Sequence, residues 1–152
     1  MSEKKLIDLY PYRLAEDSVE FLLLKMAKGK IYQNQWRMIG GKVKTGETSW
    51  KGALRELKEE TGLEPIKYWT IPSVNTFYEY ATDTINHIPA FAAELDPGSV
   101  PVLDDEHTEF GWFTLKKALE EIPWPEQKRL LELTHIIIIS NKILDDWLVP
   151  FS

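Results

Sequence analysis

Cysteine is absent from this chain of 152 residues. Its absence excludes disulfide bonds, cysteine-ligated zinc and a thiol nucleophile, and it suits a reducing compartment, so we expect a cytoplasmic protein. Long hydrophobic runs are also missing. The longest wholly aliphatic run, residues 136–139, is much shorter than the roughly 20 residues that span a bilayer. The first ten residues lack the apolar segment of a secretion signal, so we expect no membrane partner.

An excess of basic charge is missing too. The chain has 18 Lys and Arg residues against 24 Asp and Glu residues, a formal net charge of -6. Proteins that bind long nucleic acids need positive charge to neutralise the phosphate backbone, so such a partner is not expected. A small phosphorylated substrate remains compatible with an acidic protein, because bound divalent cations can reverse the local charge.

The hydrophobic residues, 43% of the chain, are sufficient for a core, and no repeat or linker marks a boundary, so we expect one domain over residues 1–152. Apolar and β-branched patterns predict strands at residues 4–14, 18–26, 68–80, 85–95 and 109–115. Helical periodicity and capping residues predict helices at residues 48–60, 114–121 and 125 to about 140. This order predicts an α/β fold with a mixed sheet between helices. The amphipathic tail, residues 143–151, could dock on its own domain or on a second subunit in a homodimer.

The predicted helix at residues 48–60 carries three carboxylates on one face. Residues three and four positions apart are neighbours on a helix, so Glu56 lies beside Glu59 and Glu60. Each like-charge pair costs roughly 0.2–0.5 kcal/mol, and a bound cation would offset that repulsion. Mg²⁺ prefers oxygen ligands and is commonly held by carboxylates together with substrate phosphates. The alternative is a solvated helix face whose carboxylates pair with Arg55 and Lys58.

The spacing around this helix follows a known pattern. Gly41 is followed after five residues by Glu47 and after seven more by Arg55-Glu56-Leu57; one residue later come Glu59-Glu60, and one later Gly62-Leu63. This arrangement resembles the signature of the Nudix hydrolases at every defined position. The resemblance implies an α/β/α sandwich with a mixed sheet. One departure is Ile39, since many family members have Pro before the Gly-Gly pair, and it bears on the substrate subgroup.

The resemblance also implies roles for the signature residues. The metal ligands would be the carbonyl of Gly40 and the carboxylates of Glu56, Glu59 and Glu60, holding Mg²⁺, with Mn²⁺ as an alternative. Glu47 would pair with Arg55 and so orient the neighbouring carboxylates.

The family resemblance implies hydrolysis of a phosphoric anhydride. This reaction needs a general base, and the sequence offers two candidates. The first is Glu56 in the signature. The second is Glu106, which with His107, Phe110 and Trp112 resembles a Glu-His-x-x-Phe-x-Trp pattern that many Nudix enzymes place before a strand. An ordinary acidic loop is the alternative reading of this second segment.

Substrate contacts are expected outside the signature. The stretches QWRMIGG and IPWPEQKRLLE look similar to the branch that contains dihydroneopterin triphosphate and dATP pyrophosphohydrolases. Aromatic rings that could stack a base or pterin, and cations that could meet phosphate, make the candidate set Trp36, Arg37, Lys42, Phe77 and Tyr78. Core packing is the alternative for the aromatics, and ordinary surface charge for the cations.

The leading prediction is a Mg²⁺-dependent hydrolase that cleaves a nucleoside triphosphate or pterin triphosphate to monophosphate and pyrophosphate. The alternative within the family is hydrolysis of a dinucleotide or a nucleotide-sugar diphosphate. A non-catalytic domain that senses a nucleotide is a third hypothesis. RNA decapping is disfavoured by the net charge of -6.

Overall fold

The N-terminal segments form a hairpin whose two strands separate as they leave the turn. The computed structural model describes residues 5–29 and 32–151. β1 (Leu6–Leu14) pairs antiparallel with β2 (Val19–Met26) from Tyr12–Phe21 to Leu14–Val19. Further from the turn, β1 pairs instead with β4 (Ile39–Lys42), and β2 pairs with β3 (Trp36–Arg37). The separation brings the glycine pair of β4 alongside the start of β1.

Three longer strands complete a mixed sheet of seven strands. They are β5 (Lys67–Glu79), β6 (Thr84–Glu94) and β7 (His107–Phe113). The path runs β3-β2-β1-β6-β5, with β4 also on β1 and β7 also on β2. β1 and β6 are parallel, and the other pairs are antiparallel. The predicted mixed sheet is therefore confirmed.

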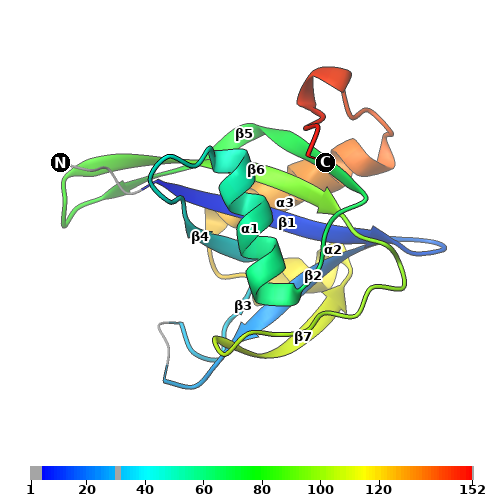
Figure 1. Cartoon of the computed structure of the whole chain (residues 1–152), viewed down its shortest axis with the longest axis horizontal. Helices are drawn as coiled ribbons and strands as arrows, with labels where there is room; N and C mark the ends of the chain where they lie inside the picture. The colour runs from blue at the N-terminus through cyan, green and yellow to red at the C-terminus, as the bar shows by residue number, and fades with distance from the viewer. Residues whose placement is uncertain (1–4, 30–31, 152) are drawn as a thin grey trace.

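Helices cover both faces of this sheet (Figure 1). α1 (Ser49–Thr61) lies on one face over a core that includes Leu9, Leu22 and Leu57. α2 (Leu115–Glu121) and α3 (Pro125–Ile139) lie on the other face, over a core that includes Tyr12 and Trp69. Successive strand residues point to opposite faces, so each strand contributes side chains to both cores. The α/β/α sandwich implied by the family resemblance is confirmed.

The predicted helices and long strands are present, with ends shifted by one or two residues. β3 and β4 were not predicted, because segments of two and four residues are too short to show a period. The tail contains a short 3-10 helix, η1 (Asp145–Trp147), and docks on its own domain. The amide of Val149 donates to the carbonyl of Tyr68 at 2.9 Å, and the ring of Trp147 stacks on Trp69.

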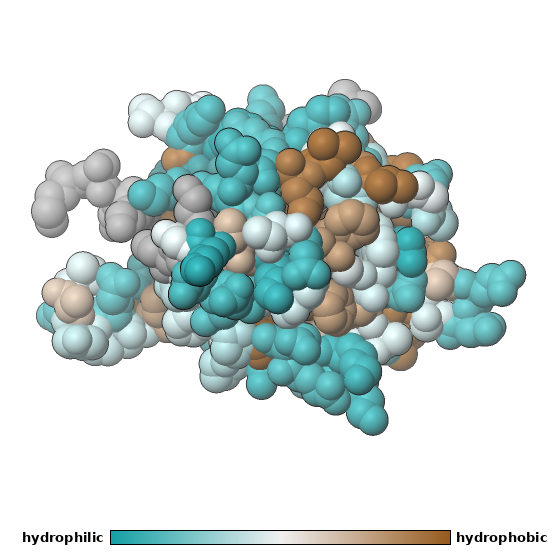
Figure 2. Space-filling view, turned by 90° about the horizontal axis from the view of Figure 1, so that it is seen from below, coloured by the Kyte–Doolittle hydropathy of each residue, from teal (hydrophilic) through white to brown (hydrophobic). Residues whose placement is uncertain are grey.

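Most of the face seen from below in the orientation of Figure 1 is hydrophilic, with smaller hydrophobic areas between the polar side chains (Figure 2). Such a surface agrees with a chain of net charge -6. No helix within residues 5–29 and 32–151 is long and apolar enough to cross a membrane.

Candidate active site

The signature helix α1 is ended by a glycine that allows a tight backbone turn. Gly62 has φ of 72°, in the left-handed region, and its amide donates to the carbonyl of Lys58. A side chain would strain this conformation, so the glycine ends the helix at low cost. α1 packs Ala53 and Leu57 into the core, which directs its acidic face toward the loop after β4.

Arg55 organises that acidic face. Its guanidinium donates to both carboxylate oxygens of Glu47, at 2.9 and 3.0 Å, and to the carbonyl of Lys42 at 2.9 Å. It also donates to Glu56 at 2.9 Å and to Glu59 at 3.2 Å. The bonds from Arg55 lower the pKa of Glu47 to about 2, and those to Glu47 raise the pKa of Arg55 above its usual value. The predicted pairing of Glu47 with Arg55 is present, and it fixes the loop to the helix.

Glu60 differs from its neighbours because it is buried and incompletely bonded. Its side chain is only 7% exposed, and its Oε2 has no hydrogen-bond partner among the described residues. Its Oε1 lies 3.5 Å from Nε2 of His107, whose Nδ1 is 2.7 Å from Asp104. Burial, followed by the neighbouring Glu56, raises the pKa of Glu60 well above its usual value. A buried carboxylate near other acidic groups is destabilised without a cation.

These residues can supply the oxygen ligands that a divalent cation requires. The unbonded Oε2 of Glu60 is available as a ligand, and a Cβ at Gly41 would overlap the Glu56 carboxyl group, so only glycine permits this close approach. Across residues 5–29 and 32–151, no three acidic or histidine side chains already converge as around a bound ion. Glu56 and Glu59 are bonded to Arg55 instead. A cation would therefore compete with Arg55 for these two carboxylates.

A cavity of about 720 Å³ opens beside Glu60. Its acidic end is lined by Glu60, Glu106 and His107, next to Gly40 and Gly41 of β4. The rest of the lining contains aromatic, cationic and amide side chains and further carboxylates; it includes Tyr32, Arg37, Phe77, Tyr78, Trp124, Asn75, Gln127, Asp8, Glu79 and Glu126. The cavity thus joins groups suited to a metal and phosphate with groups suited to a planar organic ring.

Three of the five predicted substrate contacts line this cavity: Arg37, Phe77 and Tyr78. Trp36 and Lys42 are not among its lining residues. Trp36 packs against Phe113 with ring centroids 5.0 Å apart, which is the core role given as the alternative. Lys42 contributes its backbone carbonyl to Arg55. The loop candidate Glu106 does line the cavity.

Several cavity residues were not among the five predicted substrate contacts, although Trp124 and Gln127 belong to the stretch IPWPEQKRLLE noted in the sequence. Tyr32 lies edge-on to Trp124 with centroids 6.0 Å apart, and the guanidinium carbon of Arg37 lies 4.4 Å from the Tyr32 ring centroid. Asp8, Asn75 and Gln127 meet at hydrogen-bonding distance although they belong to β1, β5 and α3. One signal was available for Asp8, since a charged residue stands between apolar residues in a buried strand.

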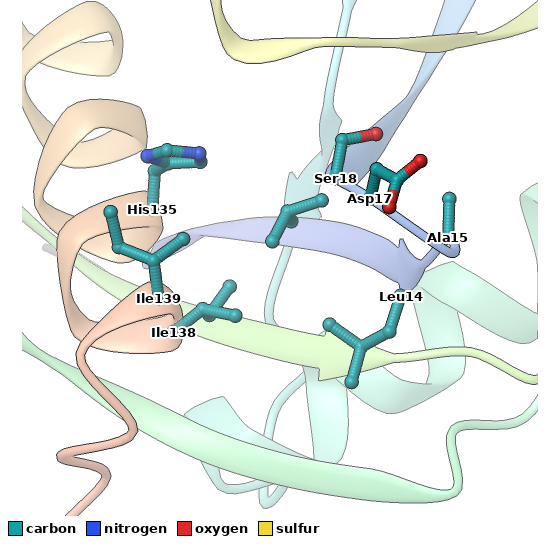
Figure 3. Close-up of a pocket in the computed structure, with 8 residues that line it drawn as sticks. Leu14, Ala15, Asp17, Ser18, His135, Ile138 and Ile139 are labelled. Carbon is teal, nitrogen blue, oxygen red and sulfur yellow. The ribbon is translucent and has the colours of Figure 1, made fainter.

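A second hollow, of about 530 Å³, lies between the β1–β2 turn and α3. Figure 3 shows Ile138 and Ile139 directed from α3 toward Leu14 at the end of β1 and the turn that holds Ser18. Its titratable lining residues are Asp17 and His135, and burial lowers the pKa of His135. These groups do not form a cluster for phosphate chemistry, so the candidate site is the cavity beside Glu60.

Comparisons with known proteins identify the family to which this chain belongs. The family model of the NUDIX domain matches residues 12–134. The bis(5'-nucleosyl)-tetraphosphatase (asymmetrical) of Mus musculus is 28% identical over 131 residues, covering 85% of this chain and 87% of that protein. The dihydroneopterin triphosphate diphosphatase of Haemophilus influenzae is 33% identical over 100 residues, covering 56% and 61%.

Among solved structures, a Caenorhabditis elegans Ap4A hydrolase in a binary complex superposes with a TM-score of 0.73. It is 25% identical, and the match covers 90% of this chain and 99% of that one. The family and the enzyme class expected from residues 41–63 are therefore confirmed. This chain belongs to the Nudix family and is a pyrophosphohydrolase that acts on phosphoric anhydrides.

Proposed function

We propose that this protein cleaves a nucleoside triphosphate or a pterin triphosphate to the monophosphate and pyrophosphate. The observation that carries the proposal is that one cavity holds both the acidic residues Glu60 and Glu106 and the rings of Phe77 and Trp124. A phosphate chain at the acidic end would place a single planar head group near these rings, and Arg37 could meet phosphate oxygens.

The carbonyl of Gly40 and the carboxylates of Glu56, Glu59 and Glu60 would hold Mg²⁺ or Mn²⁺. When bound, such an ion neutralises phosphate charge and polarises the phosphoryl group. The role of Arg55 is to hold the loop of Glu47 against α1, through two bonds to Glu47 and one to the carbonyl of Lys42. It thereby keeps the carboxylates near the positions they need.

We assign the general base to Glu106. It lines the cavity, whereas the Glu56 carboxylate is bonded to Arg55 and lies against the backbone of Gly41. The oxygen of an attacking water forms a bond to phosphorus, the bridging phosphorus–oxygen bond breaks, and the water proton passes to the Glu106 carboxylate. The leaving phosphate chain departs with the electrons of the broken bond.

A second candidate is the asymmetrical cleavage of a dinucleoside tetraphosphate. It is favoured by the mouse relative, whose alignment covers 87% of that protein, against 61% for the Haemophilus relative. Such a substrate carries two bases, so it would need a second ring contact in addition to those at Phe77 and Trp124. Its products, a nucleoside triphosphate and a monophosphate, include no free pyrophosphate.

One product analysis separates these candidates. Nucleoside triphosphates, dihydroneopterin triphosphate and dinucleoside tetraphosphates are incubated with the protein and Mg²⁺ or Mn²⁺, and the products are separated by anion-exchange chromatography. Monophosphate with an equal amount of pyrophosphate supports the proposal. Triphosphate with monophosphate from a dinucleoside tetraphosphate supports the second candidate. Binding without any turnover supports the sensor hypothesis and contradicts both.

The role of the buried carboxylate is tested with Glu60→Gln. Outer-sphere changes at metal sites typically cost 10- to 100-fold, so loss of a direct ligand is expected to lower kcat/KM by about 100-fold or more. Glu64→Gln is the matched control, because Glu64 is exposed on the loop after α1. Folded Glu60→Gln protein with the unmutated rate would contradict the assignment.

A further inference from the structure

A second carboxylate is buried at the cavity, away from the acidic face of α1. Asp8 accepts a hydrogen bond from the side-chain amide of Asn75 at 2.9 Å. The side-chain amide of Gln127 lies 3.4 and 3.5 Å from its two oxygens. All three residues are at most 6% exposed. We call Asp8, Asn75 and Gln127 the amide cluster.

The amide cluster belongs to the cavity and not to the interior of the core. All three residues line the cavity together with Phe77 and Trp124. Asp8 pairs with Gly40 across β1 and β4, and a Cβ placed on Gly40 would lie 3.9 Å from Asp8 Oδ1. Because Gly40 has no side chain, no Cβ occupies the space next to the Asp8 carboxylate.

The cluster has more acceptors than donors. Gln127 Oε1 is buried, and no described residue donates to it. Asp8 receives its hydrogen bonds from neutral amides, and within the described residues it forms no ion pair. Arg37 lowers the pKa of Asp8 only by its charge, without a hydrogen bond. Burial is the largest influence on Asp8 and raises its pKa, opposed by the bonds from Asn75 and Gln127. A ligand that brings N–H donors would satisfy both Asp8 and Gln127.

A purely structural role explains the cluster less well. Three apolar side chains could join β1, β5 and α3 without the cost of burying a carboxylate and an unpaired amide oxygen. Polar groups that stay buried and partly unsatisfied are uncommon in folded proteins, and a functional role is one accepted cause. The position of the cluster on a cavity wall, beside two aromatic rings, agrees with that cause.

We propose that the amide cluster selects a heterocycle whose edge carries a ring N–H next to an exocyclic amino group, as in guanine or a 2-amino-4-oxopteridine. Two neighbouring donors match the acceptors of Asp8 and Gln127. Adenine presents an amino group beside a ring acceptor, and hypoxanthine has the ring N–H without the amino group. The inference rests on the proposed function, because it assumes that this cavity receives a base or pterin.

The test compares guanosine and inosine nucleotides, which differ in one amino group. For turnover, kcat/KM is measured with GTP, ITP and ATP; for binding, affinities of GMP and IMP are measured by calorimetry. A matched bidentate contact typically discriminates by about 10- to 100-fold, and we expect that preference for GTP over ITP and for GMP over IMP. Equal values for guanosine and inosine, or a preference for adenosine, would overturn the proposal.

Two variants test whether the preference for guanosine over inosine nucleotides comes from the amide cluster. Asp8→Asn replaces one hydrogen-bond acceptor by a donor, and it is expected to lower kcat/KM for GTP to the value for ITP. Gln127→Met removes the unpaired oxygen at similar size and serves as a second, independent variant. Asp17→Asn, in the exposed β1–β2 turn, is the matched control and should keep the preference. A folded variant of Asp8 and one of Gln127 that both keep it would refute the assignment.

The two measurements also separate failure of this inference from failure of the proposed function. Monophosphates contain no anhydride, so their binding does not depend on catalysis. Tighter binding of GMP with no hydrolysis of any triphosphate would keep the cluster as a recognition site and remove the proposed reaction. Hydrolysis of triphosphates without preference among bases would keep the reaction and remove the recognition site.

Discussion

The carboxylates around Arg55 and the carboxylate of Asp8 are held by opposite means. Glu47, Glu56 and Glu59 all accept hydrogen bonds from one guanidinium, whereas among residues 5–29 and 32–151 Asp8 accepts side-chain hydrogen bonds only from the neutral amides of its cluster. Correspondingly, Arg55 lowers the pKa of Glu47, and burial raises the pKa of Asp8. One acidic protein thus holds carboxylates in two ways: charge pairing keeps Glu47 ionised next to the proposed metal ligands, and burial leaves Asp8 in need of hydrogen-bond donors.

The largest expected effect comes from adding a side chain at the close contact between Gly41 of β4 and Glu56 of α1. In Gly41→Ala, the new Cβ would overlap the Glu56 carboxyl group and displace it. Small displacements at a reactive centre can cost about 100-fold, so we expect kcat to fall by that factor. The control is Gly98→Ala, in a loop outside the cavity lining, measured by the same steady-state assay. Normal turnover by Gly41→Ala would show that the position of Glu56 is not critical.

A smaller effect is expected from replacing the guanidinium that organises the Glu47 loop. Arg55→Lys keeps the charge and removes the planar set of donors that reaches Glu47, Glu56 and Lys42 at once. Hydrogen bonds between charged groups contribute roughly 1.5–3 kcal/mol, so we expect the free energy of unfolding to fall by about 2 kcal/mol. Arg13→Lys, which alters the pair with Glu20 at the edge of the β1–β2 hairpin, should cost less than about 1 kcal/mol. Urea unfolding measures both, and equal losses would contradict the special role of Arg55.

The smallest expected effects are changes in the free energy of unfolding with pH, and they have opposite signs for Glu47 and Asp8. Glu47 has a folded-state pKa of about 2 against an ordinary 4.5, so it stabilises the fold above pH 4.5 and loses that contribution as the pH falls toward 2. Asp8 has a raised pKa, so its ionised form destabilises the fold at neutral pH, and that cost disappears as the pH falls below its ordinary value of 3.8. Glu47→Gln should therefore destabilise the protein at pH 7, and Asp8→Asn should stabilise it.

Both differences from the unmutated protein should shrink toward acid pH. The effect of Glu47→Gln is expected to be on the order of 1 kcal/mol or less at pH 7. Urea unfolding of both variants at pH 7, 4.5 and 3 in the presence of a chelator measures the two differences. A stability change of the same sign in both variants at pH 7 would show that the two carboxylates are held in the same way.

Much of the fold and part of the site could be predicted from local patterns. Periodicity located α1, α3 and the long strands, because each is long enough to repeat its apolar face several times. β3 and β4 were too short to be predicted. The aromatic character of Trp36 was visible in the sequence, but its packing against Phe113 depends on the pairing of distant strands.

The sequence by itself determined the family and the reaction class, through the resemblance of residues 41–63 to the Nudix signature. It also predicted Glu56, Glu59 and Glu60 as ligands, because these residues share one helix whose spacing places them on one face. Only the tertiary structure decided what surrounds them. It buried Glu60 beside His107, and it joined Asp8 to Asn75 and Gln127, which lie 67 and 119 residues away in the chain. Contacts over such separations come from strand pairing and the packing of helices on the sheet, and no local pattern records them.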